Sequence, residues 1–312
     1  METNNGSVGT GLQLVGLSED RNTQISLFVL FTAIYLITLI GNMTLVTVCI
    51  CDPHLHTPMY FFLANLSLID VCYSSAFVPN MLANLAVRRR VSFAACGTQL
   101  FTFLFLGCTE SAVLLAMAYD RYVAISLPLR YTLIMRKSIC ITMAACCWIF
   151  GSFMAIVDTV TTLQLPLCGH NVIDHFFCEP NGLIKIACTD TFYTQIVIYV
   201  VAILVLVIPS VLILLTYICI LITVVGMSSS MHQYKVFSTC ASHLVVVTIF
   251  YSSAIFMYMK PVSKNSGNRE KIGSLFYTVT PPMFNPMIYS LRNKDVKVAL
   301  HKVIWSKISP IN

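Results

Sequence analysis

Charged side chains are rare in this sequence, and several of them lie inside long apolar segments. Asp70 and Glu110 are carboxylates within two such segments, and Asp120-Arg121-Tyr122 ends the segment that contains Glu110. A charge near the middle of a membrane costs about 2.5–3.5 kcal/mol on insertion scales. If the two carboxylates lie close together, they do not both ionise without a cation. No catalytic triad, phosphate-binding loop or metal-hydrolase motif accompanies them, so we expect no enzyme.

The composition explains where these residues must lie. The chain has 312 residues, of which 57% are hydrophobic and 10% are charged, whereas soluble domains carry about 25% charged residues. Most of the chain therefore has lipid as its solvent. A helix needs roughly 20 apolar residues to cross the hydrocarbon. The segments that qualify are 24–50, 58–82, 97–125, 139–163, 192–224, 236–259 and 270–291.

The sequence also predicts an orientation. The first apolar segment is too long and too far from the start for a cleaved signal peptide, so we expect an uncleaved anchor. Lys and Arg divide almost evenly between the two sides and decide nothing. One side holds four cysteines and the glycosylation acceptor Asn5, which require the oxidising secretory lumen. We therefore predict a plasma-membrane protein with an extracellular N-terminus. The cysteines are Cys96, Cys168, Cys178 and Cys188.

Four motifs resemble one family. They read LHTPMYFFLANLSLIDVCYSS from residue 55, MAYDRYVAISLPLRY from 117, FSTCASHLVVV from 237 and SLFYTVTPPMFNPMIYSLRNK from 274. Together they resemble the class II (tetrapod-type) olfactory receptors, a branch of the rhodopsin-like G-protein-coupled receptors, from about Gly41 to Lys294. The chain departs from the family pattern at 126–128, in the weakly basic segment 228–234, and at Ser252.

The resemblance implies an all-α membrane protein, a seven-transmembrane-helix bundle with a short amphipathic C-terminal helix. We expect a single receptor domain over 1–312. Its extracellular N-terminus would span 1–23, its helix bundle 24–291 and its cytoplasmic tail 292–312.

The resemblance also assigns roles at the cytoplasmic end. Arg121 would be held in the resting state, in reach of Asp120, and would turn toward Tyr217 and Tyr289 on activation to contact a G protein. Tyr122 completes the motif. Pro209, Pro282 and Pro286 kink their helices, either as static bends or as parts of the switch. Asp70, Glu110 and Asn285 would converge below the pocket, as an allosteric sodium site or as a protonated network without an ion.

The same resemblance implies two disulfides, Cys96–Cys178 and Cys168–Cys188. A metal cluster of His170, His175, Cys178 and Glu179 is disfavoured, because a bridged Cys178 cannot act as a thiolate. No other cofactor is expected.

The ligand pocket should lie between the outer halves of several helices. Side chains on segment three recur at three- and four-residue spacing, and the resemblance adds positions on segments five to seven. The set contains no Lys or Arg. Asp158 is either a pocket residue or an interfacial residue, and we favour the interfacial position. A small, neutral, mostly apolar ligand is therefore expected. The predicted pocket residues are Phe103, Leu104, Gly107, Cys108, Ser111, Val201, Ala202, Val205, Tyr251, Ala254, Ile255, Tyr258, Ser274, Leu275 and Thr278.

The function implied is that of an odorant receptor that activates a stimulatory G protein and raises cyclic AMP. Its partners would be a volatile ligand, the G protein and the lipid bilayer, with no nucleic acid. Two alternatives stay open: a chemoreceptor of the same fold in a non-olfactory tissue, and a membrane transporter. Against the transporter, the chain has no inverted repeat and no paired broken helices.

Overall fold

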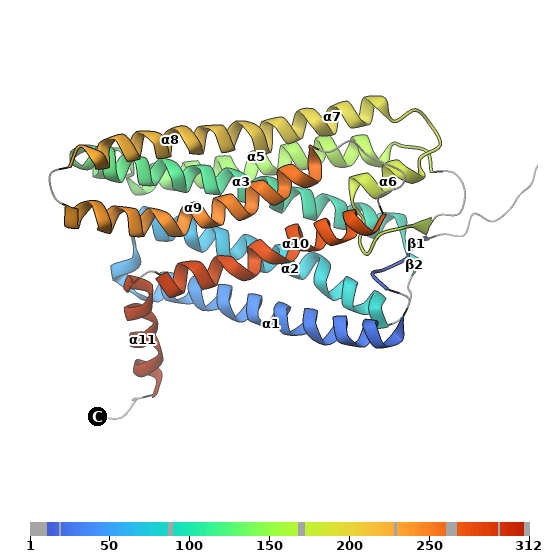
Figure 1. The fold of residues 1–312 in the computed structure, drawn as a ribbon, viewed down its shortest axis with the longest axis horizontal. Coiled ribbons are helices and arrows are strands. Elements are labelled where there is room, and N and C mark those ends of the chain that lie inside the picture. Colours follow the sequence, from blue (N-terminus) through green and yellow to red (C-terminus); the bar gives the residue numbers. More distant parts are fainter. Residues whose placement is uncertain are drawn as a thin grey trace, which may run out of the picture.

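A computed structural model describes residues 11–18, 20–86, 90–167, 172–227, 230–259, 267–292 and 294–308. In these residues, seven long helical segments run side by side and form a bundle (Figure 1). The predicted seven-helix fold is therefore confirmed. The segments are α1 (Arg21–Cys51), α2 (Pro58–Ala86), α3 (Phe93–Ser126), α5 (Lys137–Leu163), α7 to α8 (Phe192–Val225), α9 (Ser230–Tyr258) and α10 (Gly267–Arg292).

Local sequence explains where several helices begin. The side chain of Asp20 accepts a hydrogen bond from the backbone N–H of Thr23 at 2.8 Å and caps α1. Ser92 caps α3 in the same way through the N–H of Ala95, at 3.2 Å. Such caps satisfy N–H groups that have no partner within the helix. Pro58 opens α2, at a position where the missing N–H costs nothing.

The outside of the bundle is apolar over most of its length. Large hydrophobic side chains such as Ile40, Ile149 and Ile222 are exposed, and six described helical segments are long and apolar enough to cross a membrane. The seventh, α10, contains three prolines and the buried Asn285. Its polar residues suit the interior of the bundle, where neighbouring helices satisfy the backbone groups that proline frees.

One segment departs from regular α-helix. Between α7 (Phe192–Ala202) and α8 (Ile208–Val225), residues Ile203–Val207 form one turn of π-helix, labelled η3. A π-turn changes the rotation of the residues that follow it, and such turns often occur at functional sites. This turn faces α3 and α9, so it influences the packing at the centre of the bundle.

A small sheet covers one end of the bundle, which we call the strand end (Figure 1). It consists of β1 (Leu12–Leu14), β2 (Arg90–Val91) and β3 (Val172–Ile173), in the order β2-β1-β3. Strand β1 is antiparallel to β2 and parallel to β3. Leu12 and Leu14 are buried, so this stretch of the N-terminal segment is part of the core. The sequence did not predict these strands.

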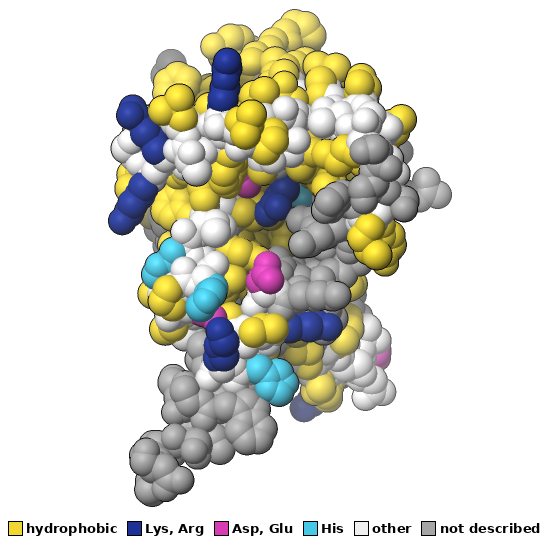
Figure 2. Space-filling model, turned by 90° about the vertical axis from the view of Figure 1, so that its left-hand side faces the viewer, with side chains coloured by type: hydrophobic (Ala, Val, Ile, Leu, Met, Phe, Trp, Pro, Cys, Tyr) yellow, Lys and Arg dark blue, Asp and Glu magenta, His cyan; other side chains and the backbone are white. Residues whose placement is uncertain are grey.

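The opposite end, which we call the Arg121 end, carries the short elements η1 (Pro53–Leu55), η2 (Pro128–Arg130) and α4 (Tyr131–Ile134). It also carries the C-terminal helix α11 (Lys294–Ile308), which leaves the bundle at an angle (Figure 1). Val296 and Ala299 of α11 are buried, whereas Lys297 is exposed. The predicted amphipathic C-terminal helix is therefore confirmed. Basic side chains are prominent over this end face (Figure 2).

Candidate functional site

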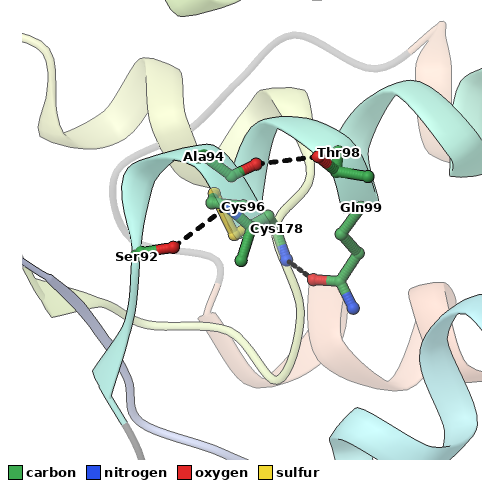
Figure 3. The surroundings of a disulfide bond; sticks show 7 residues. Ser92, Ala94, Cys96, Thr98, Gln99 and Cys178 are labelled. Carbon is green, nitrogen blue, oxygen red and sulfur yellow. Dashed lines mark hydrogen bonds between the residues drawn. A yellow bond between two sulfur atoms is a disulfide. The ribbon is translucent and has the colours of Figure 1, made fainter.

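A disulfide ties the loop after α5 to the start of α3. Cys96 and Cys178 are bonded, with their Cα atoms 5.5 Å apart, and the N–H of Cys178 donates to Gln99 Oε1 at 3.1 Å (Figure 3). The predicted pair is therefore present. Cys188 is also disulfide-bonded, whereas its predicted partner Cys168 lies outside the described residues, as does the acceptor Asn5.

The loop that contains Cys178 packs against α3 and α10 at the strand end of the bundle. Phe176 and Phe177 are buried, and the ring of Phe177 lies 5.0 Å from that of Phe103 on α3. Two polar contacts join the loop to α10. Lys271 Nζ lies 2.5 Å from Asp174 Oδ1, and Ser274 Oγ donates to Glu179 Oε2 at 3.1 Å.

The disulfide removes one candidate ligand from the metal cluster that we considered in the sequence, which includes His175, Cys178 and Glu179. Cys178 is bridged and supplies no thiolate, and His170 lies outside the described residues. His175 Nε2 lies 3.2 Å from Glu179 Oε1. Within the described ranges, no three His, Cys, Asp or Glu side chains form a potential metal site.

A cavity lies beneath this loop, between α3, α5, α7, η3, α9 and α10. Its volume is ≈ 40 Å³. One water molecule needs about 10–15 Å³ on the same measure, so the cavity has room for a small ligand. Eight predicted pocket residues line it: Phe103, Leu104, Gly107, Cys108, Val201, Ala202, Val205 and Tyr258. Four further residues line it that we did not include: Asp158, Ile198, Leu206 and Tyr277.

The packing of Tyr277 explains why residue 107 in the cavity wall is a glycine. A Cβ atom built on Gly107 would lie 3.1 Å from Tyr277 Oη, so a side chain at residue 107 would push the tyrosine away. The Tyr277 ring packs edge-on against Phe103 and Tyr258, with centroids 5.9 Å from each. The sequence showed Tyr277 inside the FYTVTPP stretch, but only packing reveals that it faces the ligand cavity.

The other predicted pocket residues lie outside the cavity lining. Ser111 and Tyr251 form a hydrogen-bonded cluster with the π-turn: their hydroxyls are 2.9 Å apart, and Ser111 Oγ donates to the carbonyl of Val205 at 2.5 Å. Thr278 donates to the carbonyl of Ser274 at 2.7 Å. Ala254 is buried, while Ile255 and Leu275 are partly buried and pack against the core.

Our interpretation of Asp158 as interfacial is wrong. Its side chain is 4% exposed, and it lines the cavity. The residue occurs near the end of an apolar segment, where an acid usually meets the headgroup region. Here Cys108 and Tyr258 line the same cavity, so the carboxyl is surrounded by protein.

A second buried polar group lies nearer the middle of the bundle. Asn285 Nδ2 donates to both oxygens of Asp70, at 3.3 and 3.0 Å. Glu110 interacts with both residues, and its Oε1 is buried without a hydrogen-bond partner in the described structure. The three residues that the resemblance grouped are therefore adjacent.

At the Arg121 end, Asp120 and Arg121 interact electrostatically, and each also has a partner from another element. Asp120 is buried and accepts a hydrogen bond from Tyr131 Oη at 2.8 Å. Burial raises the pKa of Tyr131 above its usual value, so its hydroxyl stays protonated and able to donate. Arg121 Nε donates to Met59 Sδ at 3.2 Å. The neighbouring pair is thus held by side chains from other elements.

Tyr217 and Tyr289, the predicted destinations of Arg121, are both buried. Tyr217 Oη lies 2.6 Å from His243 Nδ1. Sequence reasoning missed His243, although a histidine within the apolar stretch of α9 was a usable signal. The hydroxyl of Tyr289 has no hydrogen-bond partner among the described residues.

These features define a class of protein. Seven long helical segments, six of them apolar enough to cross a membrane, form a bundle with a cavity beneath a disulfide-tethered loop, and a polar cluster around Arg121 lies at the other end. This is the architecture of a seven-helix G-protein-coupled receptor.

The comparisons with known proteins identify the family. A sequence model described as olfactory receptor matches residues 31–307. Olfactory receptor 2D2 of Homo sapiens is 48% identical over 295 residues, which cover 94% of this chain and 95% of the relative. Olfactory receptor-like protein OLF3 of Canis lupus familiaris is 47% identical, covering 95% of this chain and 96% of the relative. The chain belongs to the olfactory receptor family, whose members are receptors that bind odorants and couple to G proteins, not enzymes.

Proposed function

We propose that this chain resides in the plasma membrane and binds small, volatile, mostly apolar molecules from the extracellular side. Binding would activate a stimulatory G protein and raise cyclic AMP. The observation that carries the proposal is the cavity beneath the loop that Cys178 ties to α3. Its lining is mainly aliphatic and aromatic, as expected of a site for small apolar ligands.

The disulfide supports the orientation. Disulfides form in the secretory lumen, which becomes the outside of the cell, so the strand end would face outward and the Arg121 end the cytoplasm. Asp70, Glu110 and Asn285 would then lie between the ligand and the G protein. We propose that this group stabilises the resting state, either by holding sodium or as a protonated network.

Two neighbouring valines of α7 provide a matched test of the pocket. Val201 lines the cavity and is 6% exposed, whereas Val200 is 49% exposed on the outer surface. Val201→Phe should fill the cavity and abolish responses to odorants, while Val200→Phe should leave them unchanged. Cells that express each receptor with a cyclic AMP reporter would be screened with a panel of volatile compounds. Surface labelling would check that both variants reach the membrane.

The screen can contradict the proposal in two ways. If no compound raises cyclic AMP in cells with the unmodified receptor at the surface, odorant-dependent coupling to a stimulatory G protein is wrong. If Val201→Phe responds normally to every agonist, the ligand binds elsewhere.

A further inference from the structure

Four carboxyl groups on the long helices are buried, and they differ in their partners: Asp70, Glu110, Asp120 and Asp158. Glu110 Oε1 has no hydrogen-bond partner among the described residues, but Glu110 interacts with Asp70 and Asn285. Asp120 accepts a hydrogen bond from Tyr131, and Asp70 accepts two from Asn285. Asp158 Oδ1 is equally buried but has no hydrogen-bond partner among the described residues. Buried polar groups nearly always have a partner, and leaving one without costs about 1–3 kcal/mol. Oδ1 of Asp158 therefore lacks the hydrogen bond that a buried carboxyl oxygen normally has.

The position of Asp158 shows where a hydrogen-bond partner for its Oδ1 atom could lie. The side chain lines the cavity together with Cys108 and Tyr258. No described lining residue is Lys, Arg or His, so the protein supplies no cation to this carboxyl within the cavity. The space that Asp158 lines is open to a water molecule or a ligand.

We propose that Asp158 is the polar anchor of the ligand site and binds the hydroxyl group of an alcohol or phenol. The proposal rests on the odorant-receptor function above and specifies its ligand class. A hydroxyl both donates and accepts. It can donate to Oδ1 and, if the carboxyl carries a proton, accept from it. A ketone, ester or ether has no O–H or N–H to donate to Oδ1 and can only accept from a protonated carboxyl, so it makes one of these two hydrogen bonds at most.

An amine is the competing ligand class, and the cavity disfavours it. An ammonium group and a carboxylate would both lose their water on entering this enclosed space, and that penalty can exceed their attraction. A neutral hydroxyl avoids most of the cost. The rest of the ligand would contact the apolar wall formed by Leu104, Ile198, Val201 and Val205.

The test uses compounds that share one carbon skeleton: an alcohol, its methyl ether, the matching aldehyde and the primary amine. Each is measured by cyclic AMP response on the full-length receptor, on Asp158→Asn and on Asp158→Leu. Val160→Leu on the outer face of α5, where Val160 is 49% exposed, is the control. We expect the alcohol to be about tenfold more potent than the ether on the unmodified receptor. Asp158→Leu should remove this difference, while Asp158→Asn, which retains a carbonyl oxygen, should keep most of it.

Two results would overturn the assignment. One is an alcohol preference that Asp158→Leu leaves unchanged. The other is an amine that is the most potent compound and loses its effect in Asp158→Asn, because that pattern requires an ion pair.

A second measurement needs no signalling. Thermal unfolding of the purified receptor should show that unliganded Asp158→Leu is at least as stable as the unmodified protein, because an unpaired buried carboxyl has been removed. The alcohol should raise the unfolding temperature of the unmodified protein by at least about 2 °C, and that of Asp158→Leu by less. A less stable unliganded variant, or equal shifts in both proteins, would show that Asp158 serves the fold. If no compound raises cyclic AMP, this measurement still decides the role of Asp158 separately from coupling.

Discussion

At the scale of single residues, several buried polar side chains of this receptor form hydrogen bonds that join different helices. Asp120 and Tyr217 are bonded to side chains of other elements, so each ties two parts of the bundle together. Such contacts hold one arrangement of the helices until something competes for them. Arg121 lies beside this network and is only partly buried. We propose that it exchanges a contact inside the bundle for one with a partner protein.

Arg121→Ala should abolish cyclic AMP production while leaving surface expression and ligand binding largely intact. The guanidinium contacts Met59 at the end of the bundle, far from the cavity that would hold the ligand. Lys297→Ala, at an exposed position of α11, is the matched loss of a positive charge and should signal normally. Reporter assays paired with a binding measurement would check this, and full signalling by Arg121→Ala would contradict the switch role.

At the scale of elements, the strand end is built from segments that are distant in the sequence. Strand β1 lies between β2 and β3, and the disulfide joins the loop after α5 to α3. The loop also contacts α10 through Asp174 and Glu179. The cover of the cavity is therefore a single packed unit, and its loss should affect folding as well as binding.

Cys96→Ser or Cys178→Ser should leave the receptor in the endoplasmic reticulum. Removing the bridge frees the loop and costs about 2–4 kcal/mol of stability. Cys72→Ser is the control, because Cys72 is a free, exposed cysteine on α2. Surface labelling and a glycan-maturation assay would measure the difference. Normal surface expression of both bridge variants would refute the proposed role.

At the scale of the whole molecule, the two ends must communicate through the bundle. The group formed by Asp70, Glu110 and Asn285 lies between the cavity and the Arg121 end and joins α2, α3 and α10. A ligand or ion that binds one arrangement of these helices more tightly shifts the population toward it. This group is therefore the natural point at which an ion would influence agonist binding.

If sodium stabilises the resting state at this group, raising the sodium concentration should weaken agonist potency. Asp70→Asn should abolish that sensitivity, because the neutral amide attracts a cation far less. Dose–response curves in sodium and in an equal concentration of a large organic cation would provide the comparison. Potency that is indifferent to sodium in the unmodified receptor would favour the protonated network.

The sequence by itself determined the number of helices, since a segment must hold about 20 apolar residues to cross a bilayer. Its motifs also indicated the family, the bridge between Cys96 and Cys178, and eight residues of the cavity wall. The tertiary structure alone decided the sheet at the strand end, the bond from Tyr131 to Asp120, and the inward position of Asp158 and Tyr277. The physical reason is that lipid tails are as apolar as the interior of the bundle. The hydrophobic pattern therefore marks where a helix lies but not which of its faces points inward. The π-turn at Ile203–Val207 adds a change of rotation that no periodicity reveals, and it helps to place Ile198 and Leu206 in the same wall.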